Sequence, residues 1–391
     1  MSAPDDLRAR GLRAAVDALR RDGNLTRSEL ARRTGVSRPT IASIIEELDR
    51  RGLVVEYQDS TTARRAPGRP ATLIRLHPSA GTALGISVER EELRVALVDL
   101  SLTVLADRSA QFALDTPAET LLELILDLAG EALADGPAER GALIGVGVGL
   151  PSPIDLETGD VDARILASWS GRPVRETLAE RLGTRVMIEN DANLEGLGEL
   201  TLGAGRGMSG AVYVKVSWGI GGAILLGGEL YRGAGGFAGE FAHIQVVEDG
   251  DACGCGRRGC LGTVASGHVL RELLEPAHGA PVSLQDIVRL AAAHDTGTLR
   301  VLKDSGRAIG STLAGVCLAL NPDAVIAGGE LGGTEPFLEG LREGLHDHVL
   351  PLTAETTAVV PAQLGKHAGA LGGAGLIVRS REALEHVVAR L

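Results

Sequence analysis

The sequence predicts an α/β protein with a small N-terminal domain of helices and one β-hairpin, followed by a larger body of two similar α/β halves. The chain has 391 residues, 44% of them hydrophobic and 23% charged, which suits a soluble globular protein with more than one core. The charged residues are unevenly distributed along the chain. Residues 1–77 carry 15 Arg and no Lys against 10 acidic residues, whereas the remainder carries 24 basic and 41 acidic residues. Along that remainder, strand-like and helix-like patterns alternate twice in a similar order.

The composition also argues against a membrane protein. No apolar run approaches the roughly 20 residues that span a bilayer, and the N-terminus lacks the basic start and apolar middle of a signal peptide. We therefore expect a cytoplasmic protein with no membrane partner.

Residues 25–48 have the pattern of a helix-turn-helix. A short helix containing Leu30 and Ala31 should end in a turn at Gly35, and a second helix should begin at Ser37, which suits an N-cap, with Pro39 in its first turn. Four apolar residues at helical spacing form the expected buried face, namely Ile41, Ile44, Ile45 and Leu48. The alternative is an ordinary helical hairpin.

The opposite face of the second helix is polar near its N-terminal end, where a recognition helix meets base edges in the major groove. The residues expected to point outward there are Ser37, Arg38, Thr40 and Ser43. A basic domain is also an electrostatic footprint for nucleic acid. We predict that these residues contact a double-stranded DNA operator.

A β-hairpin of residues 54–57 and 72–76 should follow, which in this position is the wing of a winged helix. Its tip contains Arg64, Arg65 and Arg69, which we expect to lie along phosphates or to enter a minor groove. The alternative is a flexible linker rich in arginine. Residues 1–78 are thus predicted to form a winged helix-turn-helix domain.

The acidic body begins with a predicted hairpin over residues 82–88 and 93–99, an amphipathic helix over 117–134 and a buried strand over 142–150. A second hairpin over 211–226 and a buried strand over 324–329 follow a similar scheme. Two similar halves imply a cleft between them, and small ligands usually bind in such clefts.

Three of the four cysteines lie close together, ten residues after a histidine. His243, Cys253, Cys255 and Cys260 provide one nitrogen and three sulfurs, which is a closed tetrahedral set for structural zinc. Clustered thiols in a cytoplasmic protein favour a metal over a disulfide framework. A redox switch and plain reduced thiols are the alternatives. Cys317 lies in an apolar helical run and is expected in the core.

Several motifs of the body resemble the ROK family, whose members are sugar kinases and repressors. They are Glu189-Asn-Asp-Ala-Asn193, Gly219-Ile-Gly-Gly222, Gly239-Glu-Phe-Ala-His243, Cys-x-Cys-Gly-x-x-Gly-Cys at 253–260, and Ala327-Gly-Gly-Glu330. With the head, the whole chain resembles a ROK transcriptional regulator of the NagC/XylR/Mlc type. The resemblance implies a two-lobed actin-like sugar kinase fold, a duplicated ribonuclease H-like architecture. It places one lobe at 79–205, completed by a C-terminal helix at 375–391, and a second lobe with the zinc site at 206–374.

The resemblance also implies an effector site for a sugar or sugar phosphate. Asn190 and Asp191 match the family's sugar-binding pair, and Asp191 corresponds to the base of the kinases. Glu240 and His243 would contact the sugar, with one imidazole nitrogen on the metal and the other on a ligand hydroxyl. Without the resemblance, Asn-Asp after a strand is more often a turn or a helix cap.

The chain departs from the kinases where they bind phosphate. In place of Asp-x-Gly-Gly-Thr after the first strand, it has Ser87 at the aspartate and Glu89, Arg90 and Glu91 where the glycines should stand and the motif ends. Carboxylates without glycines make a poor phosphate cradle. The second loop also carries Trp218 in its turn. We therefore expect no enzymatic activity and treat Asp191 as a vestigial base.

One sugar contact of the kinases is missing as well, because the glutamate that follows their last zinc cysteine is replaced here by Gly262. The favoured hypothesis is a DNA-binding repressor of sugar-metabolism genes with a carbohydrate effector. The alternatives are an active ROK sugar kinase with an added head, and a ligand-blind DNA-binding dimer. We expect a homodimer or homotetramer, because one helix-turn-helix reads only a half-site.

Overall fold

The structure of the chain is a computed structural model that describes residues 3–58, 72–136, 142–155, 161, 169 and 173–389. The chain divides into two compact units. The first contains Met1–Leu150, Ala167–Glu189 and Gly373–Leu391, and the second contains Pro151–Leu166 and Asn190–Gly372. The units divide before helix α6 (Asp191–Leu202), whereas the lobes predicted from the sequence divide at residue 205, after it. Asn190 and Asp191 thus share one unit with the cysteine cluster.

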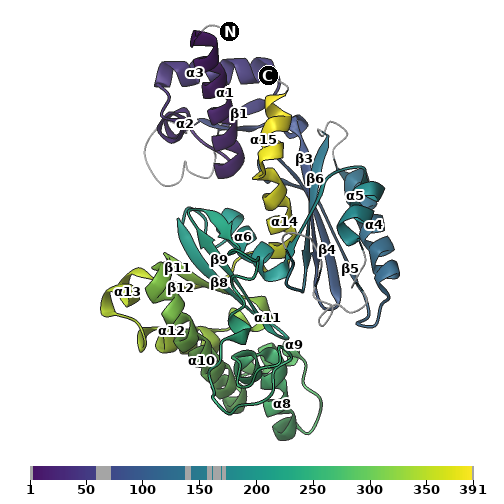
Figure 1. Cartoon of the computed structure of the whole chain (residues 1–391), viewed down its shortest axis with the longest axis vertical. Coiled ribbons are helices and arrows are strands. Elements are labelled where there is room, and N and C mark those ends of the chain that lie inside the picture. Colours follow the sequence, from purple (N-terminus) through teal and green to yellow (C-terminus); the bar gives the residue numbers. More distant parts are fainter. Residues whose placement is uncertain are drawn as a thin grey trace. The chain divides into compact units, whose positions relative to one another are not determined.

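The head at the start of the first unit is a winged helix-turn-helix, as predicted (Figure 1). Its elements are α1 (Ala3–Asp22), α2 (Arg27–Thr34), α3 (Arg38–Arg50), β1 (Val54–Gln58) and β2 (Thr72–Leu76). β1 and β2 pair antiparallel, with Val54 opposite Leu76. In the described part of the chain, no helix is long and apolar enough to cross a membrane.

Local signals place the helix ends of the head. Thr26 and Glu29 form a capping box at the start of α2. Gly35 ends this helix in the left-handed conformation, with φ of 68°, which glycine adopts without steric cost. The side chain of Ser37 then caps α3 by accepting a hydrogen bond from the backbone N–H of Thr40. The buried face of α3 contains Ile41, Ile44, Ile45 and Leu48, as the periodicity predicted.

The last turn of α1 is joined to the C-terminal segment of the same unit. Arg20, which is 1% exposed, donates through Nη1 to the carbonyl of Val378. Arg379 Nη1 in turn donates to the carbonyl of Arg21 at 3.2 Å. Val378 and Arg21 lie at the C-terminal ends of two helices, where carbonyls lack intrahelical donors. The guanidinium groups of Arg20 and Arg379 thus supply hydrogen bonds to these two carbonyls. Helix α1 also packs against α15 (Arg381–Val388).

The sheet of the first unit has the strand order β5-β4-β3-β6-β7. Its strands are β3 (Thr82–Val88), β4 (Glu92–Asp99), β5 (Val104–Gln111), β6 (Leu143–Leu150) and β7 (Val186–Asn190). β3, β4 and β5 are antiparallel neighbours, and β6 runs parallel to β3. The helical elements of this unit after the head are η2 (Pro78–Ala80), α4 (Ala118–Asp135), α5 (Val174–Leu182) and α15, and α14 (Ala368–Val378) returns the chain to it.

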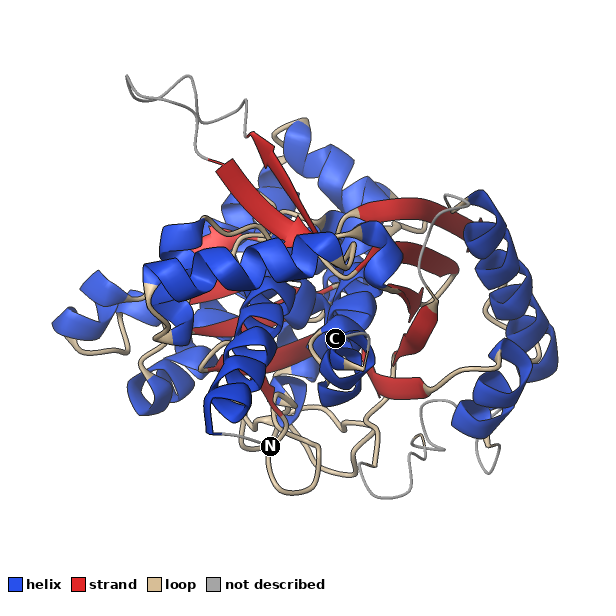
Figure 2. Ribbon diagram, turned by 90° about the horizontal axis from the view of Figure 1, so that it is seen from above, coloured by secondary structure: helices blue, strands red, loops and turns tan. Residues whose placement is uncertain are grey.

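The second unit repeats this plan with the strand order β10-β9-β8-β11-β12. Its strands are β8 (Gly210–Val216), β9 (Ile220–Leu226), β10 (Glu229–Tyr231), β11 (Ala324–Gly328) and β12 (Ala358–Pro361). Three antiparallel strands are again followed by parallel pairings, of β8 with β11 and of β11 with β12. Figure 2 shows that the chain is built from both helices and strands. This arrangement agrees with the duplicated α/β body expected from the sequence.

The helices of the second unit position the functional segments on this sheet. They are α6, η4 (Phe241–His243), α7 (Gly262–Ala265), α8 (Gly267–His278), α9 (Leu284–Ala292), α10 (Thr296–Leu320), α11 (Gly329–Gly332), α12 (Glu335–His346), α13 (Pro351–Thr356) and η5 (Gly365–His367). α10 and α12 pack at very close range. A Cβ atom at Gly340 would lie 1.9 Å from the carbonyl oxygen of Lys303, so only glycine allows this crossing.

Candidate functional site

The predicted zinc ligands come together in the second unit. The ligand atoms of His243, Cys253, Cys255 and Cys260 all lie within 4.8 Å of one another. Cys253 Sγ is 3.5 Å from His243 Nδ1, and Cys255 Sγ is 3.7 Å from Cys260 Sγ. Sulfurs that share a tetrahedral zinc with Zn–S bonds of about 2.3 Å lie about 3.8 Å apart. The four side chains therefore fit a zinc ion.

Tight backbone turns hold these ligands. The segment that follows His243 folds back on itself through the bridges Gln245↔Cys260 and Ala252↔Arg258. At Gly259, φ is 65° and a Cβ atom would lie 1.6 Å from the carbonyl oxygen of Val247. Gly259 is thus required for the loop to close around the cluster.

His243 directs its two ring nitrogens to different neighbours. Nδ1 faces Cys253, whereas Nε2 lies 4.0 Å from Oε2 of Glu240. The turn before Glu240 is set by Gly239, whose φ is 100° and which approaches the backbone of Gly222 on β9. One ring nitrogen can therefore bind the metal while the other remains on the side of Glu240, as the dual role of His243 requires.

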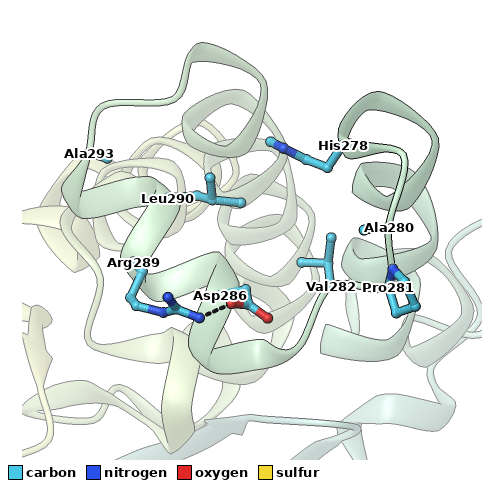
Figure 3. A pocket seen from close by; sticks show the side chains of 8 residues that line it. All are labelled: His278, Ala280, Pro281, Val282, Asp286, Arg289, Leu290 and Ala293. Atoms are coloured by element: carbon cyan, nitrogen blue, oxygen red, sulfur yellow. Dashed lines mark hydrogen bonds and ion pairs between the residues drawn. The ribbon is translucent and has the colours of Figure 1, made fainter.

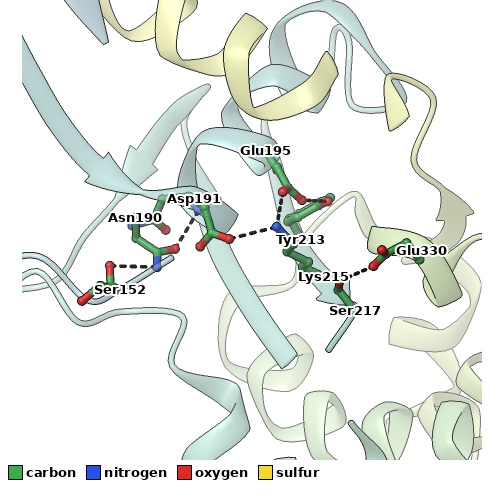
Figure 4. A network of polar contacts seen from close by, with 9 residues as sticks. Ser152, Asn190, Asp191, Glu195, Tyr213, Lys215, Ser217 and Glu330 are labelled. Carbon is green, nitrogen blue, oxygen red and sulfur yellow. Dashed lines mark hydrogen bonds and ion pairs between the residues drawn. The ribbon is translucent and has the colours of Figure 1, made fainter. Parts of the chain in front are cut away.

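Asp191 begins helix α6 and is held by a lysine on the neighbouring strand (Figure 4). Nζ of Lys215 lies 2.9 Å from Oδ2 of Asp191 and also donates to Oε1 of Glu195. Tyr213 donates its hydroxyl to the other oxygen of Glu195 at 2.6 Å. Burial raises the pKa of Tyr213 well above its usual range, and the negative charge of Glu195 raises it further. The phenol therefore keeps its proton.

Asn190 acts as a helix cap, which is the common role of an asparagine in an Asn-Asp pair after a strand. Its side chain caps α6 by accepting from the backbone N–H of Asn193 at 3.1 Å. Its amide nitrogen donates to the carbonyl of Ser152 at 3.2 Å. Both ends of the amide thus have protein partners, and a ligand contact of Asn190 stays a prediction.

The side chains of the loop between β8 and β9 contact other side chains of the second unit. Ser217 donates its hydroxyl to Glu330, which lies on α11. Trp218 stacks on His268, with ring centroids 4.9 Å apart, and the guanidinium of Arg271 lies 4.8 Å from the Trp218 centroid. A carboxylate at this loop opposes a phosphate group.

In the first unit, the turn after β3 is also unlike a phosphate loop. The backbone N–H of Glu89 donates to the carbonyl of Glu92 at 2.8 Å, which closes a tight connection into β4. Ser87, which the family resemblance places at the kinase aspartate, is 1% exposed. Arg90 and Glu91 lie in that turn.

Comparison with known proteins decides the family. The ROK family matches residues 83–380, and the MarR family matches residues 14–66 of the head. The chain belongs to the ROK family. Among its relatives, the xylose repressor of Bacillus spizizenii is 29% identical over 355 residues, which are 90% of this chain and 91% of the relative. The glucokinase of Thermotoga maritima is 32% identical over 314 residues, covering 76% and 94%.

Two solved structures of ROK proteins share the fold. A ROK family transcriptional regulator, described as a homologue of the E. coli MLC protein, superposes with a TM-score of 0.76 at 23% identity over 98% of both chains. The ROK hexokinase of Thermus thermophilus gives 0.64 at 30% identity, covering 75% of this chain and 96% of its own. The fold predicted from the sequence, a winged helix-turn-helix before a sugar-kinase-like body, is confirmed.

Of the residues predicted to contact DNA, the structure describes those of the second helix of the helix-turn-helix. Ser37, Arg38, Thr40 and Ser43 are all exposed on α3 or at its N-cap. The hydroxyls of Ser37 and Thr40 are 2.7 Å apart and hydrogen-bond to each other. The wing residues Arg64, Arg65 and Arg69 lie outside the described residues.

A separate hollow of about 370 Å³ lies between α8 and α9 (Figure 3). Its lining consists of His278, Ala280, Pro281, Val282, Asp286, Arg289, Leu290 and Ala293. Asp286 is already bound by Arg289 and by the N-terminal cap of α9. None of the predicted site residues lines this hollow, so we do not assign the effector to it.

Sequence reasoning missed Lys215, which binds Asp191, and it missed Glu195 and Tyr213, which continue the same network. It also missed the contact of Glu330 with Ser217. One signal was present for Lys215. A charged residue in the otherwise apolar strand Ala211-Val-Tyr-Val-Lys-Val216 needs a buried partner, because an unpaired buried charge is costly.

Proposed function

We propose that this ROK protein is a DNA-binding transcriptional repressor of sugar-metabolism genes, and that its second unit binds a carbohydrate effector. The similarity to xylose repressors carries the proposal, because it extends over 90% of the chain and therefore includes both the head and the body. The glucokinase relatives cover 67% and 76% of this chain.

The head supplies the DNA contacts. Arg38, Thr40 and Ser43 form the base-reading face of α3, and Ser37 fixes the start of that helix. The arginines of the wing, Arg64, Arg65 and Arg69, are assigned to phosphates or to the minor groove. A homodimer or homotetramer places two such heads on successive half-sites of one operator.

The second unit supplies the effector site. Asp191, Asn190, Glu240 and His243 are the assigned contacts for a sugar or sugar phosphate. A zinc ion held by His243 and the three clustered cysteines stabilises the fold and orients the imidazole. The effector changes operator affinity through its different affinities for the DNA-bound and the free forms of the protein.

The same protein is not an enzyme in this proposal. Glu89, Arg90 and Glu91 stand where the first phosphate loop has Gly-Gly-Thr, and Glu330 accepts a hydrogen bond from the Ser217 hydroxyl of the second loop. One oxygen of Asp191, the former base, is bound by Lys215. Each of these groups works against ATP binding or against deprotonation of a sugar hydroxyl.

The test begins with selection of an operator from a library of random DNA duplexes by the zinc-loaded full chain. Fluorescence anisotropy then measures affinity for the selected duplex, with and without xylose, glucose and their phosphates. We expect sequence-selective binding that one of these sugars weakens at least about tenfold, a typical allosteric coupling. Asp191→Ala and Glu240→Ala should abolish the sugar response while leaving DNA binding intact.

Three outcomes separate the hypotheses. Failure to select any sequence would exclude the repressor. Selective DNA binding without response to any sugar would favour the ligand-blind dimer. Sugar-dependent consumption of ATP, followed in a coupled assay, would establish the kinase alternative.

A further inference from the structure

Lys215 is a buried lysine in a chain that otherwise relies on arginine. It is one of three lysines among 39 basic residues. It is 8% exposed on β8, and its neighbours Val214 and Val216 are fully buried. A buried ammonium is costly unless charged or polar partners compensate it. The carboxylates of Asp191 and Glu195, which contact Lys215, compensate its buried charge.

Lys215 binds one of the two carboxylate oxygens of Asp191. Both oxygens of Glu195 have donors, because Lys215 binds one and Tyr213 the other. Asp191 is bound by Lys215 through Oδ2, and in the described part of the chain no hydrogen bond to its Oδ1 is found. An ionised carboxylate only accepts hydrogen bonds. Oδ1 can thus accept the hydroxyl of a bound ligand while the lysine fixes the other oxygen.

The charges of this cluster select against anions. Two carboxylates and one ammonium leave a net charge of −1, and Tyr213 is neutral. Glu240, which is assigned to the same effector site, adds a further negative charge. A phosphate group would meet like charges in partly desolvated surroundings, whereas a sugar hydroxyl donates a hydrogen bond at little electrostatic cost.

We propose that Lys215 positions Asp191 as a hydrogen-bond acceptor, so that the site binds an uncharged sugar through a hydroxyl and rejects the phosphate ester of the same sugar. This inference rests on the proposed function, in which the second unit binds a carbohydrate effector. It narrows the effector class from a sugar or sugar phosphate to the free sugar.

Calorimetric titration of the zinc-loaded full chain tests this with matched pairs of probes, D-glucose with its 6-phosphate and D-xylose with its 1-phosphate. In the pair that binds, we expect the free sugar to bind at least about tenfold more tightly than the ester, because like charges brought together at a binding site are strongly unfavourable. Lys215→Met should weaken binding of the free sugar at least about tenfold, because Asp191 loses its positioning partner.

Lys303→Met is the matched control. Lys303 also binds two carboxylates, with Nζ 2.8 Å from Glu339 and 2.7 Å from Glu343, but it joins α10 to α12 and contacts no assigned effector residue. Its substitution should leave sugar affinity unchanged. If Lys215→Met folds, binds zinc and keeps the wild-type affinity and selectivity, Lys215 is merely structural and the inference is wrong.

If Lys215→Met does not fold, Asp191→Asn provides the test, because it removes one negative charge from the cluster. In this variant, the ratio of the affinity for the free sugar to the affinity for its ester should fall at least about threefold. Equal or tighter binding of the ester by the wild-type protein would overturn this inference and leave the proposed effector site in place. No binding of either member of either pair would overturn this inference together with the proposed carbohydrate effector, and DNA binding that persists would then favour the ligand-blind dimer.

Discussion

His243 Nε2 lies 4.0 Å from Glu240 Oε2, while the other nitrogen of the same ring lies 3.5 Å from Cys253 Sγ. The imidazole thus separates a thiol-rich side, suited to zinc, from a carboxylate side, suited to a hydroxylated ligand. Metal loading and effector binding are expected to depend on each other through this one side chain.

The first prediction concerns the metal. Cys255→Ser should lose most of the bound zinc and lower the melting temperature by at least about 5 °C, because a metal that binds only the folded chain stabilises it. Zinc is measured by atomic emission after dialysis, and melting by circular dichroism.

Cys317→Ala is the control for that experiment. Cys317 is buried in α10, and burial raises the pKa of its thiol to about 11, as expected for a core thiol. Its replacement should lower stability without changing the zinc content. A full complement of zinc in Cys255→Ser would refute the ligand set.

The second prediction concerns DNA binding. Arg38→Ala should weaken operator binding by roughly 5- to 150-fold, because a side chain that contacts base or phosphate contributes about 1–3 kcal/mol. Arg206→Ala, which removes an exposed arginine from the second unit, should have little effect. The measurement is fluorescence anisotropy with a selected duplex. Equal affinity of both variants at moderate salt would exclude Arg38 from the interface.

Features that depend on neighbouring residues were predictable from the sequence. The Ser37 cap and the Gly35 turn each rest on residues a few positions apart, and the structure has them where the sequence placed them. The cluster of His243 with three cysteines was recognisable for the same reason, because its ligands span only 18 residues. The alternation of strands with helices predicted the body.

Contacts between distant residues were not predictable in this way. Lys215 meets Asp191 only because α6 packs beside β8, and the two residues are 24 positions apart. Arg20 meets Val378 across 358 positions. Neither pairing leaves a local pattern, because a single arginine or lysine in a sequence does not indicate which carboxylate or carbonyl it will reach.

The third prediction concerns Glu199, another residue whose role depends on distant contacts. Its buried carboxylate accepts hydrogen bonds from the backbone N–H groups of Ala204 at 2.8 Å, Gln363 at 2.9 Å and Leu364 at 2.7 Å. Glu199→Ala should destabilise the protein by about 3 kcal/mol or more, because buried donors lose a charged acceptor. Glu199→Gln keeps one acceptor oxygen and should cost less. Urea unfolding measures both, and equal stability of Glu199→Ala and wild type would contradict the assignment.

The fourth prediction concerns the dependence of stability on pH. Asp323 Oδ2 accepts from Gly210 N at 3.0 Å and from Ser209 N at 2.7 Å, and these backbone hydrogen bonds lower the pKa of the carboxyl. A carboxyl with a lowered pKa in the folded state contributes stability that is complete above its unfolded pKa of about 3.9. This contribution is lost as the pH falls through the folded value.

Asp323→Asn should therefore be less stable than the wild type at pH 7, and the difference should shrink as the pH falls below about 4. Urea unfolding at a series of pH values measures the free energy of both proteins. Asp115→Asn is a suitable control, because Asp115 is exposed and no hydrogen bond or ion pair of its side chain is found in the described part of the chain. A difference between Asp323→Asn and wild type that stays constant from pH 7 to acid would show that the charge of Asp323 does not contribute, since a neutral amide accepts hydrogen bonds independently of pH.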